Sequence, residues 1–184
     1  AGGGLEGARG KRGGGLWNQW RQAGGGMYGP NGAAVGIVSR SSVAATPEPD
    51  LFCMALLARF EGYFPRFSRL ISGHDDCLTW AVLKGRTRNG GGSVRLRSAD
   101  ALDTPLINFA QFEEGSPGSQ DDMRAMVEAI RALRGLTAPL IESGRIAQEI
   151  QPGPQVQSDE EIARYVRDTA WGHHASCTCP IGAK

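Results

Sequence analysis

The sequence is poor in cysteine. Four cysteines in 184 residues are too few for a disulfide framework at this length. Cys177 and Cys179 are separated by a single residue, which is poor geometry for a disulfide between them. Reduced thiols are therefore the expected state of these side chains, and that state favours a cytoplasmic location.

The sequence also lacks an excess of charge and a long apolar run. The formal net charge is +1 at pH 7, which provides no general attraction to nucleic acid or to an anionic membrane. The longest apolar run, which includes residues 52–58, is far too short to cross a bilayer. No secretory signal segment is recognisable near the first residue. An apolar fraction of 40% with a charged fraction of 21% is typical of a globular domain with one core.

Glycine is the abundant residue, with 27 copies. Residues 2–7 and residues 24–29 both satisfy the G-x-G-x-x-G pattern of dinucleotide-binding proteins. A functional fingerprint follows a buried strand and opens a helix, so that the helix N-terminus meets the phosphates. The first match has no strand before it, and the turn residues 30–32 follow the second, so neither is predicted to bind a dinucleotide. Residues 1–27 are expected to form a glycine-rich, disordered segment.

The apolar period changes along the chain from that of strands to that of helices. After a short predicted helix over 16–22, apolar runs or alternation predict strands over 51–57, 77–87, 93–99 and 107–109. Turn residues between the second and third of these strands predict that the two pair as a hairpin.

Two helices are expected after the strands. Apolar residues from 123 to 133 recur at helical spacing, and they predict a core helix with a capping box at Ser119 and Asp122 and a stop at Gly135. A cleaner capping box at 158–161 opens a second helix that leads directly to Trp171. Strands followed by helices predict an α+β fold, in which an antiparallel sheet has helices packed on one face.

Side chains that can bind a metal ion or act as a nucleophile or an acid/base follow directly after the second predicted helix. His173, His174, Cys177 and Cys179 lie within seven residues, and three kinds of chemistry are open to them. A non-enzymatic zinc-binding module would use all four as ligands, although structural zinc sites usually draw on two separated pairs. A cysteine nucleophile needs a base that the fold brings from elsewhere, and no such base is evident. A histidine can also act as acid/base beside an organic cofactor, because imidazole titrates near neutral pH.

The same stretch resembles a family motif. His174–Gly182 is similar to the H-x-x-G-T-C-x-M-G motif of the glucose–methanol–choline (GMC) oxidoreductases, flavoenzymes that oxidise alcohols. Cys177 stands where the family has glycine, and Ile181 where it has methionine. Gly92–Asp100 resembles the family's G-x-V-x-L-x-S-x-D-P strand, with Ala101 in place of the proline.

Further segments carry the resemblance in the family's order. Pro105–Phe109 resembles the P-x-I-x-x-N segment that follows the strand, and Ser158–Val166 resembles the helix before the histidine. Tyr28–Gly32 resembles the entry to the substrate domain. The likeness extends from about Leu16 to Gly182, and it is strongest after residue 92.

The resemblance implies a substrate-binding domain over residues 28–170 and an active-site segment over 171–184 that leads back to a flavin domain. It implies FAD as cofactor and a small-molecule alcohol as substrate. It assigns His174 as the acid/base that takes the alcohol proton while hydride passes to the flavin, and it gives His173 no role. The flavin-binding fingerprint and the second active-site His or Asn of the family are not found in the sequence. We therefore expect a fragment of a larger FAD enzyme that is inactive alone, with the zinc-binding module as the alternative.

Overall fold

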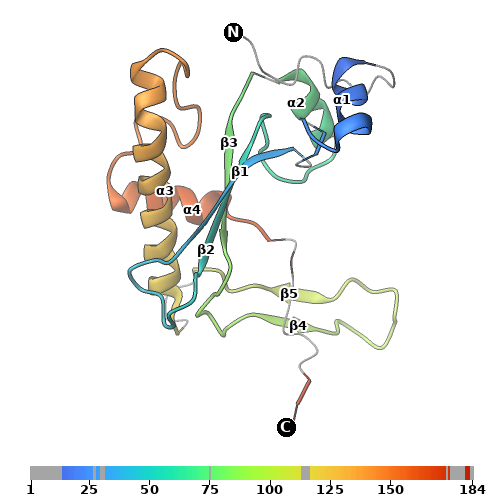
Figure 1. Ribbon diagram of the computed structural model, residues 1–184. Helices are drawn as coiled ribbons and strands as arrows, with labels where there is room; N and C mark the ends of the chain where they lie inside the picture. Colours follow the sequence, from blue (N-terminus) through green and yellow to red (C-terminus); the bar gives the residue numbers. More distant parts are fainter. Residues whose placement is uncertain are drawn as a thin grey trace. The chain divides into compact units, whose positions relative to one another are not determined.

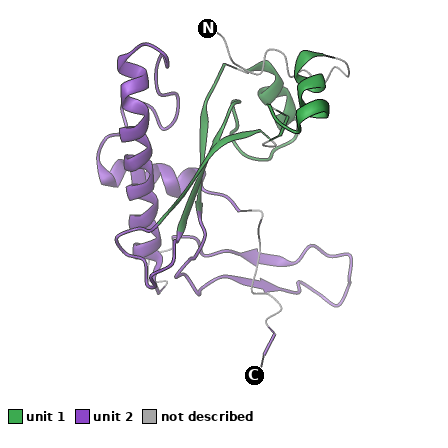
Figure 2. Ribbon diagram, viewed as in Figure 1, with its two compact units in different colours: residues 1–39, 51–83 green, residues 40–50, 84–184 purple. Residues whose placement is uncertain are grey.

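The chain forms two compact units, which are described separately (Figure 1). The computed structural model describes residues 14–26, 28–29, 32–74, 76–112, 117–172, 174 and 181–182. Figure 2 colours the first unit, residues 1–39 and 51–83, and the second unit, residues 40–50 and 84–184. Both contain antiparallel strand pairs and helices, so the predicted α+β class is confirmed. None of the helices described has both the length and the apolar composition needed to cross a membrane.

The first unit contains a three-stranded sheet and two short helices. In chain order the elements are α1 (Gly15–Ala23), β1 (Ala33–Ser39), β2 (Leu51–Leu56), α2 (Phe67–Gly73) and β3 (Thr79–Lys84, of which Lys84 belongs to the second unit). The strand order is β1-β2-β3, so β2 is central, and β1 runs antiparallel to it. The predicted helix over 16–22 and strand over 51–57 are confirmed, whereas β1 and α2 were not predicted.

The central strand β2 has one buried face. Its residues alternate between buried and half-buried because side chains on a strand point to opposite faces with a period of two. Leu51, Cys53 and Ala55 are the buried set. On the other face the ring of Phe52 lies over Gly36 of β1, since a Cβ added to Gly36 would come within 3.3 Å of the ring. The glycine therefore makes room for the aromatic side chain across the strand pair.

The second unit is built around a helix pair. Its elements are β4 (Ser93–Arg95), β5 (Leu106–Asn108), α3 (Ser119–Glu142) and α4 (Asp159–Thr169). Met123 and Val127 of α3 form a buried cluster with Ile162 and Val166 of α4, and Ile162 is fully buried. These four residues recur at the three- or four-residue spacing of a helix face, so the amphipathic pattern of each helix is what joins them.

The predicted hairpin between 77–87 and 93–99 is wrong. β3 joins the sheet of the first unit, whereas β4 pairs antiparallel with β5 of the second, from Ser93 opposite Asn108 to Arg95 opposite Leu106. The physical reason lies in the connecting loop, where the backbone N–H groups of Arg88 and Asn89 donate to the carboxylate of Asp122 in α3. The loop is held by a helix, and β4 takes a partner further along the chain.

Asp122 consequently does not complete the capping box predicted with Ser119. The N-cap of α3 is Gly118, which makes no side-chain capping bond, and both oxygens of the Asp122 carboxylate accept from the loop at 2.9–3.0 Å. Gly118 has a φ of 78°, and a Cβ there would lie 2.8 Å from the carbonyl oxygen of Arg88. Glycine is required because the helix start and the loop approach so closely.

A buried ionic cluster adjoins this contact. The Lys84 ammonium lies 2.9 Å from the Asp50 carboxylate and 3.6 Å from that of Asp122, and all three side chains are less than 10% exposed. The backbone N–H and the hydroxyl of Ser41 both donate to Asp50 at 2.7 Å. Burial raises the pKa of Asp50, but these hydrogen bonds and the lysine charge outweigh it and hold the pKa at about 2.

The core helix α3 is longer than predicted. It continues through Gly135 and Pro139 to Glu142, so Gly135 is not its stop. A helix ends at glycine when that residue adopts a left-handed conformation, and Gly135 does not have a positive φ. Thr137 donates to the carbonyl of Leu133 at 2.9 Å and provides a side-chain bond within this last part of the helix.

The lowered pKa of Asp50 predicts that the free energy of unfolding decreases in acid. Its pKa in the folded chain lies below the ordinary value of 3.8, so its contribution is complete above about pH 5 and is lost as the pH falls towards 2. We expect Asp50→Asn to lower the free energy of unfolding at pH 7 by about 2 kcal/mol or more, and to flatten the change between pH 5 and pH 2. Urea denaturation at several pH values measures both. Asp168→Asn, at an exposed position on α4, is the control; an equal pH dependence in Asp50→Asn and the unsubstituted chain would contradict the prediction.

Candidate functional site

The candidate site begins where α4 ends. The capping box predicted at 158–161 is confirmed: the Ser158 hydroxyl accepts from the Glu161 N–H at 3.2 Å, and the Glu161 carboxylate accepts from the Ser158 N–H at 2.9 Å. At the other end the Ala170 N–H donates to the Val166 carbonyl at 2.8 Å, and Ala170 is extended. The chain therefore leaves a well-defined helix directly into Trp171, Gly172 and the histidines.

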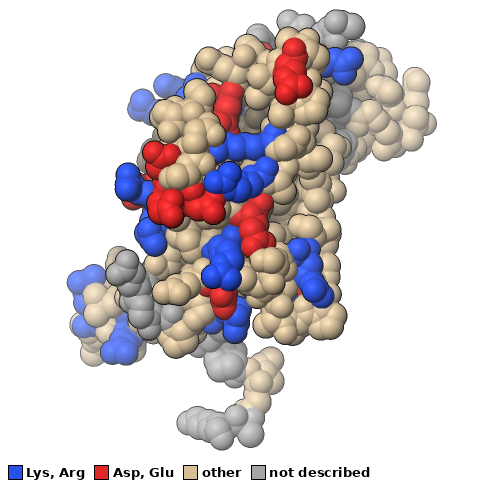
Figure 3. All heavy atoms as spheres, turned by 90° about the vertical axis from the view of Figure 1, so that its left-hand side faces the viewer, with Lys and Arg blue, Asp and Glu red and all other residues tan. Residues whose placement is uncertain are grey.

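Ion pairs join α3 to the first turn of α4 and to the loop before it. The Arg131 guanidinium of α3 contacts the Asp159 carboxylate in the first turn of α4 at 2.5 Å, and it also donates to the Gln157 carbonyl at 3.1 Å. Arg134 makes a bidentate pair with Glu149 at 2.9 Å. Figure 3 shows basic and acidic side chains interspersed on the side of the molecule where α3 lies in Figure 1, without a field of one sign.

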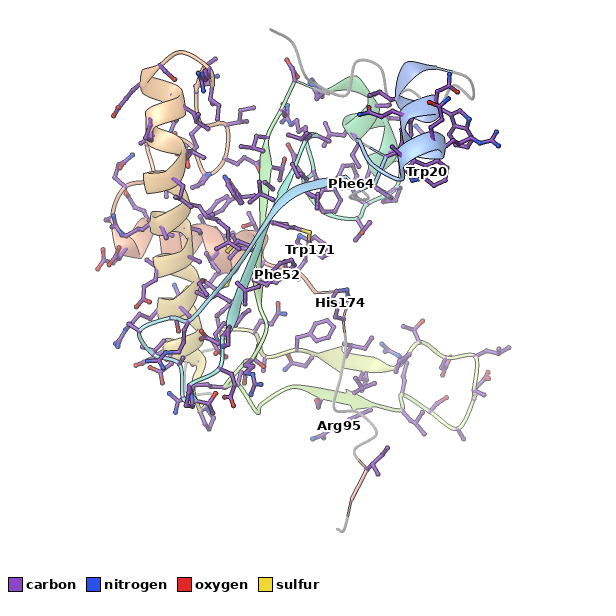
Figure 4. All side chains as sticks on the ribbon, viewed as in Figure 1. Trp20, Phe52, Phe64, Arg95, Trp171 and His174 are labelled. Atoms are coloured by element: carbon purple, nitrogen blue, oxygen red, sulfur yellow. The ribbon has the colours of Figure 1, made fainter. Side chains whose placement is uncertain are left out.

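His174, the predicted acid/base, is exposed on the segment that follows α4. Figure 4 labels it together with Trp171, which is 46% exposed, on that segment. An exposed imidazole at this position is accessible to a reactant, which is the first requirement for proton transfer.

One neighbour within the second unit locates the segment. A Cβ built on Gly172 would lie 3.4 Å from the Nε2 atom of Gln111, so the carboxamide of Gln111 lies beside Gly172, two residues before His174. Gln111 follows β5 along the chain. The histidine segment thus runs past the end of the β4–β5 hairpin.

The turn that carries Gln111 is unusual. Ala110 and Phe112, on either side of it, have φ values of 47° and 57°, although left-handed conformations are uncommon for residues other than glycine. Each such residue costs on the order of 1 kcal/mol, and strained residues concentrate at functional sites. The Asn108 side chain accepts from the Ala110 N–H at 2.8 Å, and the Asn89 side chain donates to the Ala110 carbonyl at 2.5 Å. Hydrogen bonds from two asparagines therefore hold this turn.

The other members of the His/Cys cluster lie outside the described residues. These are His173, Cys177 and Cys179, so the four-ligand zinc site stays a prediction. Among the residues that the structure does describe, no three His, Cys, Asp or Glu side chains come together in a way that could hold a metal ion.

The two described cysteines have the properties of protonated thiols. Cys53 is buried in β2, and its burial raises the pKa of the thiol. Burial also raises the pKa of Cys77, and the neighbouring Asp76 carboxylate adds to that effect. Because the thiolate is the nucleophile and the metal ligand, neither environment favours cysteine chemistry.

The second glycine pattern does not form a dinucleotide site. Gly24, its first residue, is the left-handed C-cap of α1, and its N–H donates to the Trp20 carbonyl at 2.8 Å. The pattern therefore follows a helix, whereas the fingerprint follows a strand and opens a helix. The first pattern, residues 2–7, lies outside the described residues.

A shallow groove of about 400 Å³ follows the β4–β5 hairpin. It is lined by both strands and by the loop between them, including the arginines at 95 and 97. Arg97 donates to the Thr104 carbonyl at 3.0 Å, and this hydrogen bond links the two sides of the loop between β4 and β5. Figure 4 labels Arg95 on β4.

Sequence reasoning missed the residues around the histidine segment. Gln111, Asn89 and Asn108 are common polar residues, and their roles depend on contacts with distant backbone. Two local signals were available, because asparagine favours an Asx-turn with the N–H two residues further on. Asn108 accepts from the Ala110 N–H and Asn89 from the Gly91 N–H, both at 2.8 Å.

Comparisons with known proteins match the part of the chain that contains this segment. A family model described as GMC oxidoreductase matches residues 88–184, more than half of the chain. The glucose methanol choline oxidoreductase atC of Aspergillus terreus is 34% identical over 166 residues, covering 86% of this chain and 25% of that protein. An oxygen-dependent choline dehydrogenase of Staphylococcus aureus is 35% identical over 95 residues, covering 51% of this chain and 16% of that protein. The chain spans a quarter or less of the length of these relatives.

The helix that delivers His174 depends on its N-cap. We expect Ser158→Ala to lower the free energy of unfolding by about 1 kcal/mol, because it removes the acceptor for the Glu161 N–H. Thermal unfolding followed by circular dichroism measures the loss. Ser68→Ala, at an exposed position in α2, is the matched control and should change stability little; equal effects of the two substitutions would contradict the prediction.

Proposed function

The chain belongs to the GMC oxidoreductase family, and we propose that it forms part of an FAD-dependent enzyme that oxidises the CH–OH group of an alcohol. The single observation that carries the proposal is His174, which stands exposed at the motif position just after the capped helix α4. The names of the relatives, among them a choline dehydrogenase, support an alcohol as the substrate class.

His174 is the proposed acid/base. In its neutral form a ring nitrogen can accept the proton of the alcohol hydroxyl, and the oxygen then gains alkoxide character. That change strengthens the adjacent carbon as a hydride donor. Bound FAD would supply the hydride acceptor.

The described residues include the proposed acid/base of this site, but they do not include a binding site for the FAD phosphates. The glycine pattern at 24–29 caps a helix, so it does not supply the backbone N–H groups at a helix N-terminus that bind a dinucleotide phosphate. We therefore assign residues 28–170 to a substrate-binding domain and residues 171–184 to the active-site segment. The main FAD-binding residues would belong to another part of the enzyme.

His174→Ala tests the assignment of the acid/base. In the enzyme that contains this chain we expect the substitution to lower kcat for alcohol oxidation by about 100-fold or more, because a general base typically contributes ~10²–10⁴. The absorption spectrum of the bound flavin should stay nearly the same. His74→Ala, at the exposed C-cap of α2, is the matched control. Turnover of His174→Ala close to that of the control would remove His174 from the mechanism.

FAD titration tests the assignment of the cofactor-binding part. We expect the purified 184-residue chain neither to bind FAD tightly nor to oxidise alcohols, because the described residues do not form a dinucleotide fingerprint. Flavin fluorescence during the titration is the measurement. Saturable, tight binding with a change in flavin fluorescence would contradict this expectation.

A further inference from the structure

One face of the β4–β5 hairpin is apolar and exposed. Val94 and Ile107 lie directly opposite each other on the paired strands, so their side chains share a face. Leu96 and Phe109 come two positions further along the chain from each of them, the spacing that returns to the same face of a strand. The four side chains are between 47% and 84% exposed. Together they form what we call the apolar hairpin face.

The opposite face of the hairpin, the groove face, is basic. Arg95 follows Val94 along β4 and lies opposite Leu106 of β5. Arg97 comes two positions further on, and both arginines line the shallow groove along the hairpin. A guanidinium that is buried loses its hydration, and this loss costs free energy unless an acceptor replaces the water. The groove face is therefore suited to solvent, whereas the apolar hairpin face is suited to cover by other protein.

The hairpin is held at one end although its apolar face is open. At the end where β4 begins and β5 ends, the Asn89 side chain donates to the Ala110 carbonyl at 2.5 Å, and the Asn89 N–H donates to the Asp122 carboxylate of α3 at 3.0 Å. A two-stranded hairpin is marginally stable in water unless its apolar face packs on something. A single exposed apolar side chain is ordinary, but a row of them on one face indicates an interaction surface.

The size of the apolar hairpin face favours a part of the same polypeptide over a second copy of the chain. Complete cover of four such side chains buries on the order of 400 Å², which is half of the roughly 800 Å² that one partner contributes to a standard interface between separate proteins. Parts of one polypeptide meet at a high effective concentration, so a smaller area suffices. The chain spans 25% of the length of the Aspergillus relative and 16% of the Staphylococcus one, so most of such a protein consists of residues that this chain does not contain.

We propose that the apolar hairpin face is the docking surface for the FAD-binding part of the same enzyme. The inference rests on the proposed function, in which the main FAD-binding residues belong to another part of the enzyme. Gln111, which follows the hairpin, lies beside Gly172, two residues before His174. The part that holds the flavin against the alcohol must approach this same region, because reacting groups have to be brought close together. It is therefore the part that is placed to cover the hairpin.

Cysteine labelling in the enzyme that contains this chain tests whether the face is covered. Ile107→Cys introduces a thiol on the apolar hairpin face, and Leu106→Cys introduces one on the groove face of the same strand. The two native side chains are 53% and 47% exposed, so they are closely matched. We expect N-ethylmaleimide to modify the introduced thiol of Ile107→Cys about 10-fold more slowly than that of Leu106→Cys, because a covered thiol reacts only when the contact opens.

Peptide mass spectrometry separates these rates from those of the native cysteines. Val94→Cys and Arg95→Cys repeat the comparison on the other strand, and the first should again be modified more slowly. Equal rates within both pairs of variants would overturn the proposal.

Photo-crosslinking identifies what covers the face. A p-benzoylphenylalanine in place of Leu96, the most exposed of the four side chains, reacts with neighbouring C–H bonds on irradiation. We expect crosslinked peptides from the part of the same polypeptide that carries a dinucleotide fingerprint, with the mass of the enzyme unchanged. Crosslinks between two polypeptides, or only to residues within the 184 of this chain, would overturn the proposal.

Failure of the proposed function gives a different result. An enzyme that contains this chain but neither binds FAD nor oxidises alcohols would refute the proposed function. The labelling rates and the crosslinks do not depend on turnover, and they would still decide whether the rest of the polypeptide covers the apolar hairpin face.

Discussion

The second unit depends on the carboxylate of Asp122. It accepts hydrogen bonds from two successive backbone N–H groups, those of Arg88 and Asn89, at 2.9–3.0 Å, and it lies 3.6 Å from the buried ammonium of Lys84. An unpaired charge at a buried position is costly, so each of these partners is needed to keep Asp122 there. One side chain in the first turn of α3 thereby fixes the loop from which the β4–β5 hairpin begins.

The position of the candidate site depends on these hydrogen bonds to the Asp122 carboxylate. Asn89, held through its N–H by Asp122, donates its side-chain amide to the carbonyl of the left-handed Ala110, at the end of the hairpin where β4 begins and β5 ends. The side chain of the next residue, Gln111, lies beside Gly172 in the segment that carries His174. The other approach to the histidine is α4, which is capped by Ser158 and packed on α3 through the fully buried Ile162. The segment before His174 thus follows a helix that packs on α3, and it passes a turn whose hydrogen bonds lead back to Asp122 of α3.

Much of the helical part, and the family, could be predicted from the sequence. The capping box at 158–161, the helix around Trp17, the strand β2 and the short strand β5 were predicted, since each is encoded by residues within a few positions of one another. The motif around His174 led to the GMC oxidoreductase family, which the match over residues 88–184 shows. The hairpin joining β3 to β4 was wrong, because the glycines and asparagine at 89–92 are favourable for a turn but equally suit a loop held by a distant carboxylate.

The sequence by itself therefore determined the elements with local signals, the α+β class and the family. The tertiary structure decided which strands pair, that Asp122 binds a loop instead of capping its own helix, and that Gln111 lies beside Gly172. The physical reason is the separation of the partners along the chain. Asp122 lies 33 or 34 positions from its backbone donors, and Gln111 lies 172 − 111 = 61 positions from Gly172. Periodicity and capping patterns depend on residues within a few positions of one another. Neighbours that are 33 to 61 positions apart come together only when the chain has folded.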